Sequence, residues 1–169
     1  MRIDKALKAL LKFKKTDMDQ GGKDIAKKHR AQIVSGKDHK NKSFKEYRPL
    51  YAQKKASGNA AKNQISTQTN PVNLVLTGDM INAFDFISST VDGTEVGFDY
   101  GIEDTKQAQK MQWMADGVFG KKTIKSRRRI VASDDNLGST VESALATLFV
   151  NQINKNLKKL TGRPTIIRM

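Results

Sequence analysis

The residues that could carry chemistry begin with a set of carboxylates in the middle of the chain. Two-metal nucleases need several convergent carboxylates, and the candidates here are Asp79, Asp85, Asp99, Glu103, Asp104, Asp116 and the pair Asp134-Asp135. Most of them also fit structural roles. Asp79 and Asp104 precede expected helices as caps, Asp92 belongs to an expected turn, and Asp134-Asp135 belong to an expected loop. We therefore expect no metal site.

The histidines and the absence of cysteine narrow the enzyme classes further. The chain has His29, His39 and no cysteine, which excludes a three-histidine metal site, thiolate metal sites and a cysteine nucleophile. His29 falls on an apolar helical stripe, typical of a packed side chain, and His39 lies in a lysine-rich segment that we expect to be exposed. Gly120-Lys121 resembles the end of a phosphate-binding loop, but Ala115 stands where its first glycine belongs. The sequence predicts no enzyme, no catalytic residue and no cofactor.

The strongest candidate binding site is a cluster of cations between residues 121 and 129. Such a cluster can neutralise several phosphates of a DNA backbone without reading the bases. Phe119 is the only aromatic residue nearby, so stacking on single-stranded bases is not expected. We predict contact with DNA, with a lumen that holds DNA, or with a neighbouring subunit for Lys121, Lys122, Lys125, Arg127, Arg128 and Arg129.

Charge is distributed unevenly along the 169 residues, whose net charge is +14. The balance is +12 over residues 1–62, −6 over residues 63–120 and +8 over residues 121–169. Such a chain can align unlike charges between neighbouring copies, and it can also present a basic surface to a polyanion. No apolar run approaches the roughly 20 residues of a membrane span, and no signal peptide is recognisable. We expect a soluble, intracellular protein without membrane contact.

Helices are expected at both ends of the chain. Apolar residues recur at helical spacing over residues 1–16, and Gly21-Gly22 is expected to break that run before a second helical stretch. Pro49 should begin a short helix, because proline is tolerated in the first turn. The clearest helix spans residues 139–160: it opens with a capping-box pattern and ends at Gly162.

The centre of the chain shows β patterning. Alternating apolar residues predict a short strand over residues 72–76. Asp92-Gly93, between two runs rich in β-branched and aromatic residues, predicts a hairpin with a type I′ turn. That turn would pair Val91 with Thr94, and would place Phe84 and Phe86 on the opposite face from Val91, Ile87, Val96, Phe98 and Tyr100. Both faces would then be apolar, so we expect a helix or a neighbouring subunit on each.

Together these elements predict a single α+β domain over residues 1–169, with a small antiparallel β-sheet, N-terminal helices and a long C-terminal helix packed on it. Its expected parts are a basic helical region (1–56), a flexible loop (57–70), a β-rich centre (71–131), the C-terminal helix (139–161) and a docking tail (162–169). The tail is apolar for a chain terminus, and Ile166 and Ile167 are its candidate partner-docking residues.

Several short motifs follow one another in an order that resembles a known family. They are Phe44-x-x-Tyr47-x-Pro49-Leu50-Tyr51-x-x-Lys54, Leu74-x-Leu76-Thr77-Gly78-x-Met80, Val96-Gly97-Phe98, Phe119-Gly120 and Arg128-Arg129-Ile130-Val131-x-Ser133-Asp134-Asp135. Over roughly residues 44–155 the chain resembles the virion morphogenesis and tail-completion proteins of the tailed-phage neck. In that family a Leu-Thr-Gly segment begins the sheet, and an Arg-rich segment precedes the last helix.

The resemblance implies a structural, non-catalytic virion protein at the head–tail junction. It would form a homo-oligomeric ring, a hexamer or a dodecamer, around the DNA channel. Its partners would be its own copies, the neighbouring neck and tail proteins and, through non-specific contact, the packaged DNA. The alternative reading of the residues is a sequence-independent double-strand DNA-binding protein, which the cation cluster would also suit.

Overall fold

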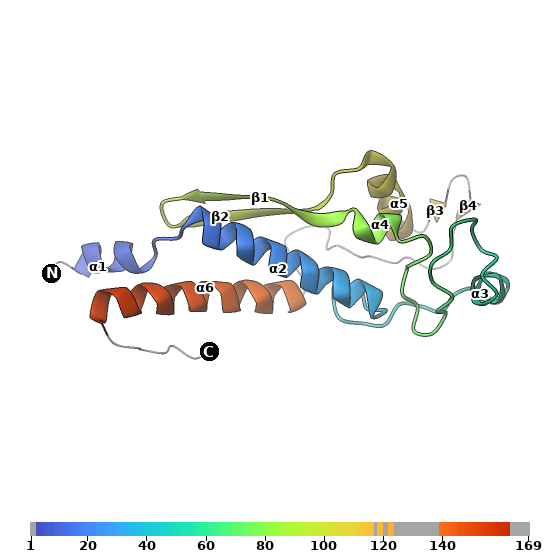
Figure 1. The fold of residues 1–169 in the computed structure, drawn as a ribbon, viewed down its shortest axis with the longest axis horizontal. Coiled ribbons are helices and arrows are strands. Elements are labelled where there is room, and N and C mark those ends of the chain that lie inside the picture. Colours follow the sequence, from blue (N-terminus) through green and yellow to red (C-terminus); the bar gives the residue numbers. More distant parts are fainter. Residues whose placement is uncertain (1–2, 117, 120–121, 124–138, 163–169) are drawn as a thin grey trace.

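The computed structural model describes residues 3–116, 118–119, 122–123 and 139–162. Its elements are α1 (Ile3–Leu10), α2 (Lys15–Val34), α3 (Pro49–Ala56), α4 (Asp79–Asn82), β1 (Phe84–Asp92), β2 (Glu95–Ile102), α5 (Thr105–Asp116), β3 (Val118–Phe119), β4 (Lys122–Thr123) and α6 (Ser139–Thr161). The long helix α2 lies between the β1–β2 hairpin and α6, while α3 lies beyond the C-terminal end of α2 (Figure 1). The predicted α+β class and the long C-terminal helix are confirmed.

Helix α2 runs through the glycine pair that was expected to interrupt it. Gly21 and Gly22 are both buried inside α2, where neighbouring elements approach the backbone closely. A Cβ atom on Gly21 would lie 2.4 Å from a methyl carbon of Leu148 on α6, and one on Gly22 would lie 2.3 Å from the ring of Phe86 on β1. The prediction of a helix break was wrong, because these glycines serve close packing on both sides of one helix.

The hairpin forms as predicted, but its turn is shifted by one residue. Asp92 pairs with Glu95 and Val91 pairs with Val96, so the two turn residues are Gly93 and Thr94. Gly93 has a φ of +60°, and glycine at the first central position is typical of a type II′ turn rather than the expected type I′. The predicted pairing of Val91 with Thr94 was therefore wrong.

The predicted assignment of side chains to the two faces of the sheet was also wrong, because β1 contains a β-bulge. The register shifts between Phe86 and Ser88, so Ile87 has no direct partner and its side chain is 43% exposed. The extra residue brings Phe84 and Phe86 onto the same face as Phe98 and Tyr100, the face that packs on α2. Only one face of the sheet is apolar, so the expected cover on both faces is not needed.

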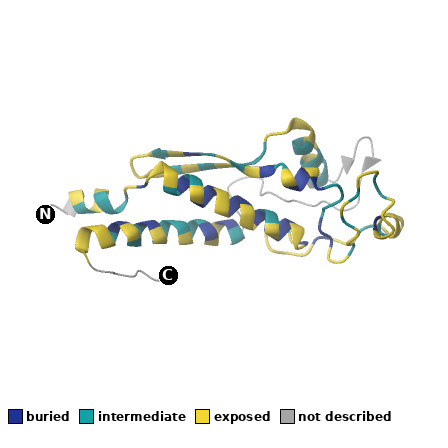
Figure 2. Ribbon diagram, in the orientation of Figure 1, coloured by how far each residue is buried: buried dark blue, intermediate teal, exposed yellow. Residues whose placement is uncertain are grey.

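The core forms two clusters along the molecule. Ile25 of α2 packs with Val141 and Ala144 of α6, and this cluster extends to Tyr100, Leu145 and Leu148. The second cluster is built from Ile33, Phe44, Val72, Met80 and Ile81. Figure 2 shows the buried stripe of α2 running between the hairpin and α6, and shows α3 largely exposed.

The segment predicted as a strand over residues 72–76 adopts an irregular conformation instead. Leu74 has a φ of +52°, a left-handed conformation that no strand contains. The side chain of Asn73 folds back to accept a hydrogen bond from the Val75 amide (3.2 Å) and donates one to Ser66 (3.0 Å). Residues 57–70 contain no helix or strand, as the loop prediction required. Their predicted flexibility stays a prediction.

Candidate assembly interface

The cation cluster falls almost entirely outside the described residues. The backbone of Lys122 pairs with Phe119 in the short β3–β4 ladder. Lys121, Lys125 and Arg127 to Arg129 lie outside the described part of the chain, as do Ile166 and Ile167. Their predicted contacts with DNA, with a lumen or with a partner therefore stay predictions.

The carboxylates of the centre take structural roles. Asp104 accepts a hydrogen bond from the Gln107 amide (2.9 Å) at the start of α5, and Thr77 donates one to Asp79 (2.8 Å). Asp85 lies 3.5 Å from the guanidinium of Arg30. Among the described residues, no three His, Asp or Glu side chains gather in a way that could hold a metal ion.

Both histidines are buried. His29 is packed edge-on against the rings of Phe84 and Tyr100, with ring centroids 5.1 and 5.9 Å away. It is a packing residue between α2 and the hairpin, as its apolar stripe suggested. His39 is 8% exposed, so the expectation that it faces solvent was wrong.

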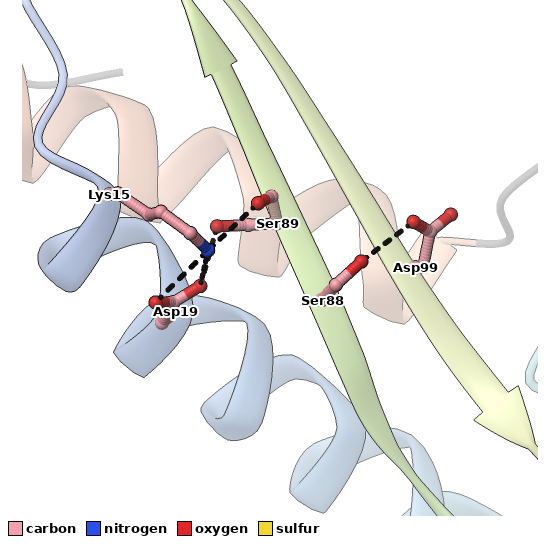
Figure 3. Close-up of polar contacts among 5 residues, drawn as sticks. All are labelled: Lys15, Asp19, Ser88, Ser89 and Asp99. Carbon is pink, nitrogen blue, oxygen red and sulfur yellow. Dashed lines mark hydrogen bonds and ion pairs between the residues drawn. The ribbon is translucent and has the colours of Figure 1, made fainter.

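A serine, a carboxylate and a lysine meet where α2 approaches β1 (Figure 3). Ser89 donates a hydrogen bond to Asp19 (2.7 Å), and Lys15 donates to Asp19 (3.0 Å) and to the Ser89 carbonyl (3.0 Å). The Ser89 hydroxyl and the Lys15 ammonium hold the pKa of Asp19 below its usual value, which makes this carboxylate a weaker base. Ser89 is also buried, and these contacts attach strand β1 to helix α2.

An apolar groove runs between β2, α2 and α6, with a cavity volume of about 190 Å³. Its walls are the half-buried side chains of Val96, Phe98 and Tyr100 on β2 and of Leu145 and Phe149 on α6, and its floor includes Gly22 and Ile25 on α2. This volume lies below the roughly 300 Å³ at which pockets for drug-sized ligands begin. The groove has room for no more than one or two side chains.

The outward face of the hairpin is acidic. Thr90, Glu95 and Asp99 are exposed on the side of the sheet that points away from α2, and β1 and β2 contain no Lys or Arg. Within the described residues, Ser88 donates a hydrogen bond to Asp99 (2.9 Å; Figure 3), while no ion pair reaches Glu95 or Asp99. On a chain of net charge +14, Glu95 and Asp99 make this face acidic, on the opposite side of the hairpin from the apolar groove.

Comparison with known proteins gives no further guide, because no family model, curated protein or solved structure matches the chain. Within the described residues, no helix has both the length and the apolar character needed to cross a membrane.

The sequence predicted that the groove residues are apolar core residues, but not that they line a groove. Phe98 and Tyr100 alternate along one strand, and Leu145 and Phe149 are four residues apart on one helix, which is the pattern of buried faces. The sequence could not reveal that these residues stay half-buried. Their exposure depends on how far α2 separates β2 from α6.

Proposed function

We propose that the chain is a structural component of a tailed-phage virion that forms a homo-oligomeric ring in the neck, at the head–tail junction around the DNA channel. The observation that supports self-assembly best is the apolar groove on one side of the hairpin together with the acidic face on its other side, on a strongly basic chain. The family resemblance over roughly residues 44–155 supplies the location in the virion.

Self-assembly follows from two properties of the described surface. The basic helices and the acidic outer face of the hairpin belong to the same chain, so neighbouring copies can place unlike charges opposite one another. Exposed ion pairs contribute only about 0–1 kcal/mol each, but each one repeats at every interface of a ring. The apolar groove adds an attraction that salt does not screen.

The neighbouring neck and tail proteins are the further partners in this proposal. The tail at residues 162–169, with Ile166 and Ile167, is the segment proposed to dock on one of them, and the cation cluster is proposed to line the DNA channel. Deletion of residues 164–169 should then impair docking to a neck partner more than it impairs folding.

The oligomeric state of the purified chain tests the proposal. We expect mass photometry and negative-stain images to show closed rings or strong self-association at low salt, with association that weakens as salt rises but persists. A chain that stays monomeric at high concentration and low salt, also in the presence of its neck partners, would contradict the ring. The alternative of a double-strand DNA-binding protein would then be preferred.

A further inference from the structure

We propose that the free edge of β2 takes up the tail of a second copy as a third, antiparallel strand, with Ile167 and Met169 in the apolar groove and Arg168 on the acidic outer face. The inference rests on the proposed self-assembly and names the surfaces that meet. The tail and the β2 edge are different surfaces, so their contact generates closed rings or open filaments rather than two-fold dimers.

The hairpin has one edge covered by α2 and one edge open. β1 and β2 form a two-stranded sheet, and Lys15 of α2 donates a hydrogen bond to the Ser89 carbonyl of β1 (3.0 Å; Figure 3), which therefore points away from β2. In an antiparallel ladder, hydrogen-bonded pairs alternate with pairs whose backbone groups point outward. Ser89 pairs with Phe98 and Val91 pairs with Val96, so Phe98 and Val96 present their amide and carbonyl groups at the open edge of β2.

Within the part of the chain that the structure describes, nothing occupies this edge. No group outside the hairpin forms a hydrogen bond with the backbone of Glu95–Ile102. An open edge is a template for a further strand, because each unpaired amide and carbonyl then gains a partner. Extended segments bind such edges with main-chain hydrogen bonds for affinity and with pockets for alternate side chains for specificity.

The apolar groove supplies the pocket for alternate side chains. Phe98 belongs to its wall on β2, and Leu145 and Phe149 belong to its wall on α6. In an added antiparallel strand, the residue opposite Phe98 points to the same face of the sheet, as does every second residue from it. Ile167 and Met169 have this spacing, and the groove has room for one or two side chains.

The residues between those positions would lie on the outer face of the hairpin, where β2 has Glu95 and Asp99. Arg168 follows Ile167 and precedes Met169, so it points to the outer face when they point into the groove. Opposite charges on neighbouring strands are stabilising, and β1 and β2 contain no basic residue. Pairing of β2 with β2 of a second copy would instead gather the carboxylates of both copies on one face.

The tail cannot fill the groove of its own copy. Phe149 forms the end of the groove nearest the end of α6, and the helical rise from Phe149 to Gly162 is about 20 Å. The Phe149 side chain points toward the start of the helix, which lengthens the path. The segment from Gly162 to Ile167 spans at most about 18 Å when fully extended. Ile167 therefore stops short of the groove, and the occupant has to be the tail of a second copy.

A synthetic tail peptide with methylated amides tests strand addition. A fluorescent peptide of residues 162–169 is titrated with the full chain, diluted below its self-association, and followed by anisotropy. We expect saturable binding that N-methyl groups on Ile167 and Met169 weaken about tenfold or more, because these amides face β2 in the added strand. The matched control has N-methyl groups on Ile166 and Arg168, which face away from β2, and should retain binding. Equal effects of the two modifications, or no binding, would overturn the proposal.

A charge exchange tests the contact on the outer face. Asp99→Lys should weaken self-association about three- to tenfold at low salt, because Arg168 then meets a like charge, and adding Arg168→Glu should restore part of the loss. Asp24→Lys on α2 is the matched control: both carboxylates are exposed and accept a hydrogen bond from a neutral side chain. This control should leave association unchanged. Equal losses from the two lysine substitutions would show that net charge alone acts, and would contradict the inference.

The failure of this inference differs from the failure of the proposed function. Deletion of residues 164–169 should disperse the rings with an unchanged melting temperature. If rings persist after the deletion and only the contact with another neck protein is lost, the tail docks outside the ring, so this inference is wrong while ring assembly stands. A wild-type chain that never associates would overturn both proposals.

Discussion

At the scale of single residues, the least expected side chain is Lys55, which is completely buried. Its ammonium donates hydrogen bonds to Asn73 (2.7 Å) and to the Tyr47 hydroxyl (3.1 Å), and it lies 4.7 Å from the centre of the Tyr47 ring. A buried charge is tolerated only when hydrogen bonds and nearby π electrons replace its hydration. Lys55 therefore attaches α3 to the irregular segment around Asn73.

Tyr100 gives a pH-dependent prediction at the same scale. Burial raises the pKa of the Tyr100 phenol above its ordinary value of 10.0, because desolvation disfavours the phenolate. The contribution of this group to stability is complete below pH 10. It is lost as the pH rises from about 10 toward the higher pKa of the folded state, because the unfolded chain ionises first.

Denaturant unfolding between pH 8 and 11 tests this expectation. We expect the wild-type free energy of unfolding to fall above pH 10 more steeply than that of Tyr100→Phe, and tyrosinate absorbance should show a late-titrating phenol that the variant lacks. Parallel pH curves for the two proteins would contradict the assignment.

At the scale of elements, the α2–α6 contact depends on Gly21 facing Leu148. Gly21→Ala would gain about 1 kcal/mol of helix propensity, but its methyl group would collide with the Leu148 side chain, and overpacking costs about 1–3 kcal/mol. We expect a net loss of stability in spite of the better helix former. Leu148→Ala should cost about 2 kcal/mol, at the lower end of the range for core leucines because this side chain is half-buried.

A double variant separates the effect of the Gly21–Leu148 contact from the effect of helix propensity at position 21. In Gly21→Ala with Leu148→Ala the collision is absent, so the loss in the free energy of unfolding should be smaller than the sum of the two single losses. Lys23→Ala, on the exposed side of α2, is the control and should stay within about 0.5 kcal/mol of wild type. Simple additivity would show that α6 does not approach α2 at Gly21.

At the scale of the whole molecule, the cation cluster gives the prediction that separates DNA contact from subunit contact. Reversing charge at Lys121, Lys122, Lys125 and Arg127 to Arg129 to Glu should weaken DNA retention in assembled particles, or weaken DNA binding by the isolated chain and flatten its salt dependence. The same number of reversals among exposed lysines of the N-terminal region should have less effect. Those lysines are Lys5, Lys8, Lys12, Lys23, Lys27 and Lys28.

Each outcome of this experiment indicates a different binding partner for the cation cluster. Equal losses in the two variants would mean that net charge alone attracts DNA. Unchanged DNA binding together with weaker self-association would mean that the cluster contacts an acidic surface of a neighbouring subunit, for which the outer face of the hairpin, with Glu95 and Asp99, is the candidate.

The sequence by itself determined the elements whose signals are local. The helix from Ser139 to Thr161, the proline-initiated α3, the cap at Asp104 and the existence of a hairpin at Gly93 could all be predicted, because caps, turn residues and apolar periodicity act over a few neighbouring positions. The packing role of His29 followed in the same way from the stripe on which it lies.

Only the tertiary structure decided which side chains face one another across elements. The bulge at Ile87 turned Phe84 and Phe86 toward α2, and the glycine pair stayed helical because Leu148 and Phe86 approach it from two sides. No local pattern encodes a one-residue register shift or the distance between two packed helices, since both follow from the fit of the whole core. For the same reason the candidate interface could not be predicted: Phe98 and Phe149 are core residues by pattern, and only the spacing of β2 and α6 on either side of α2 leaves them half-buried in a groove.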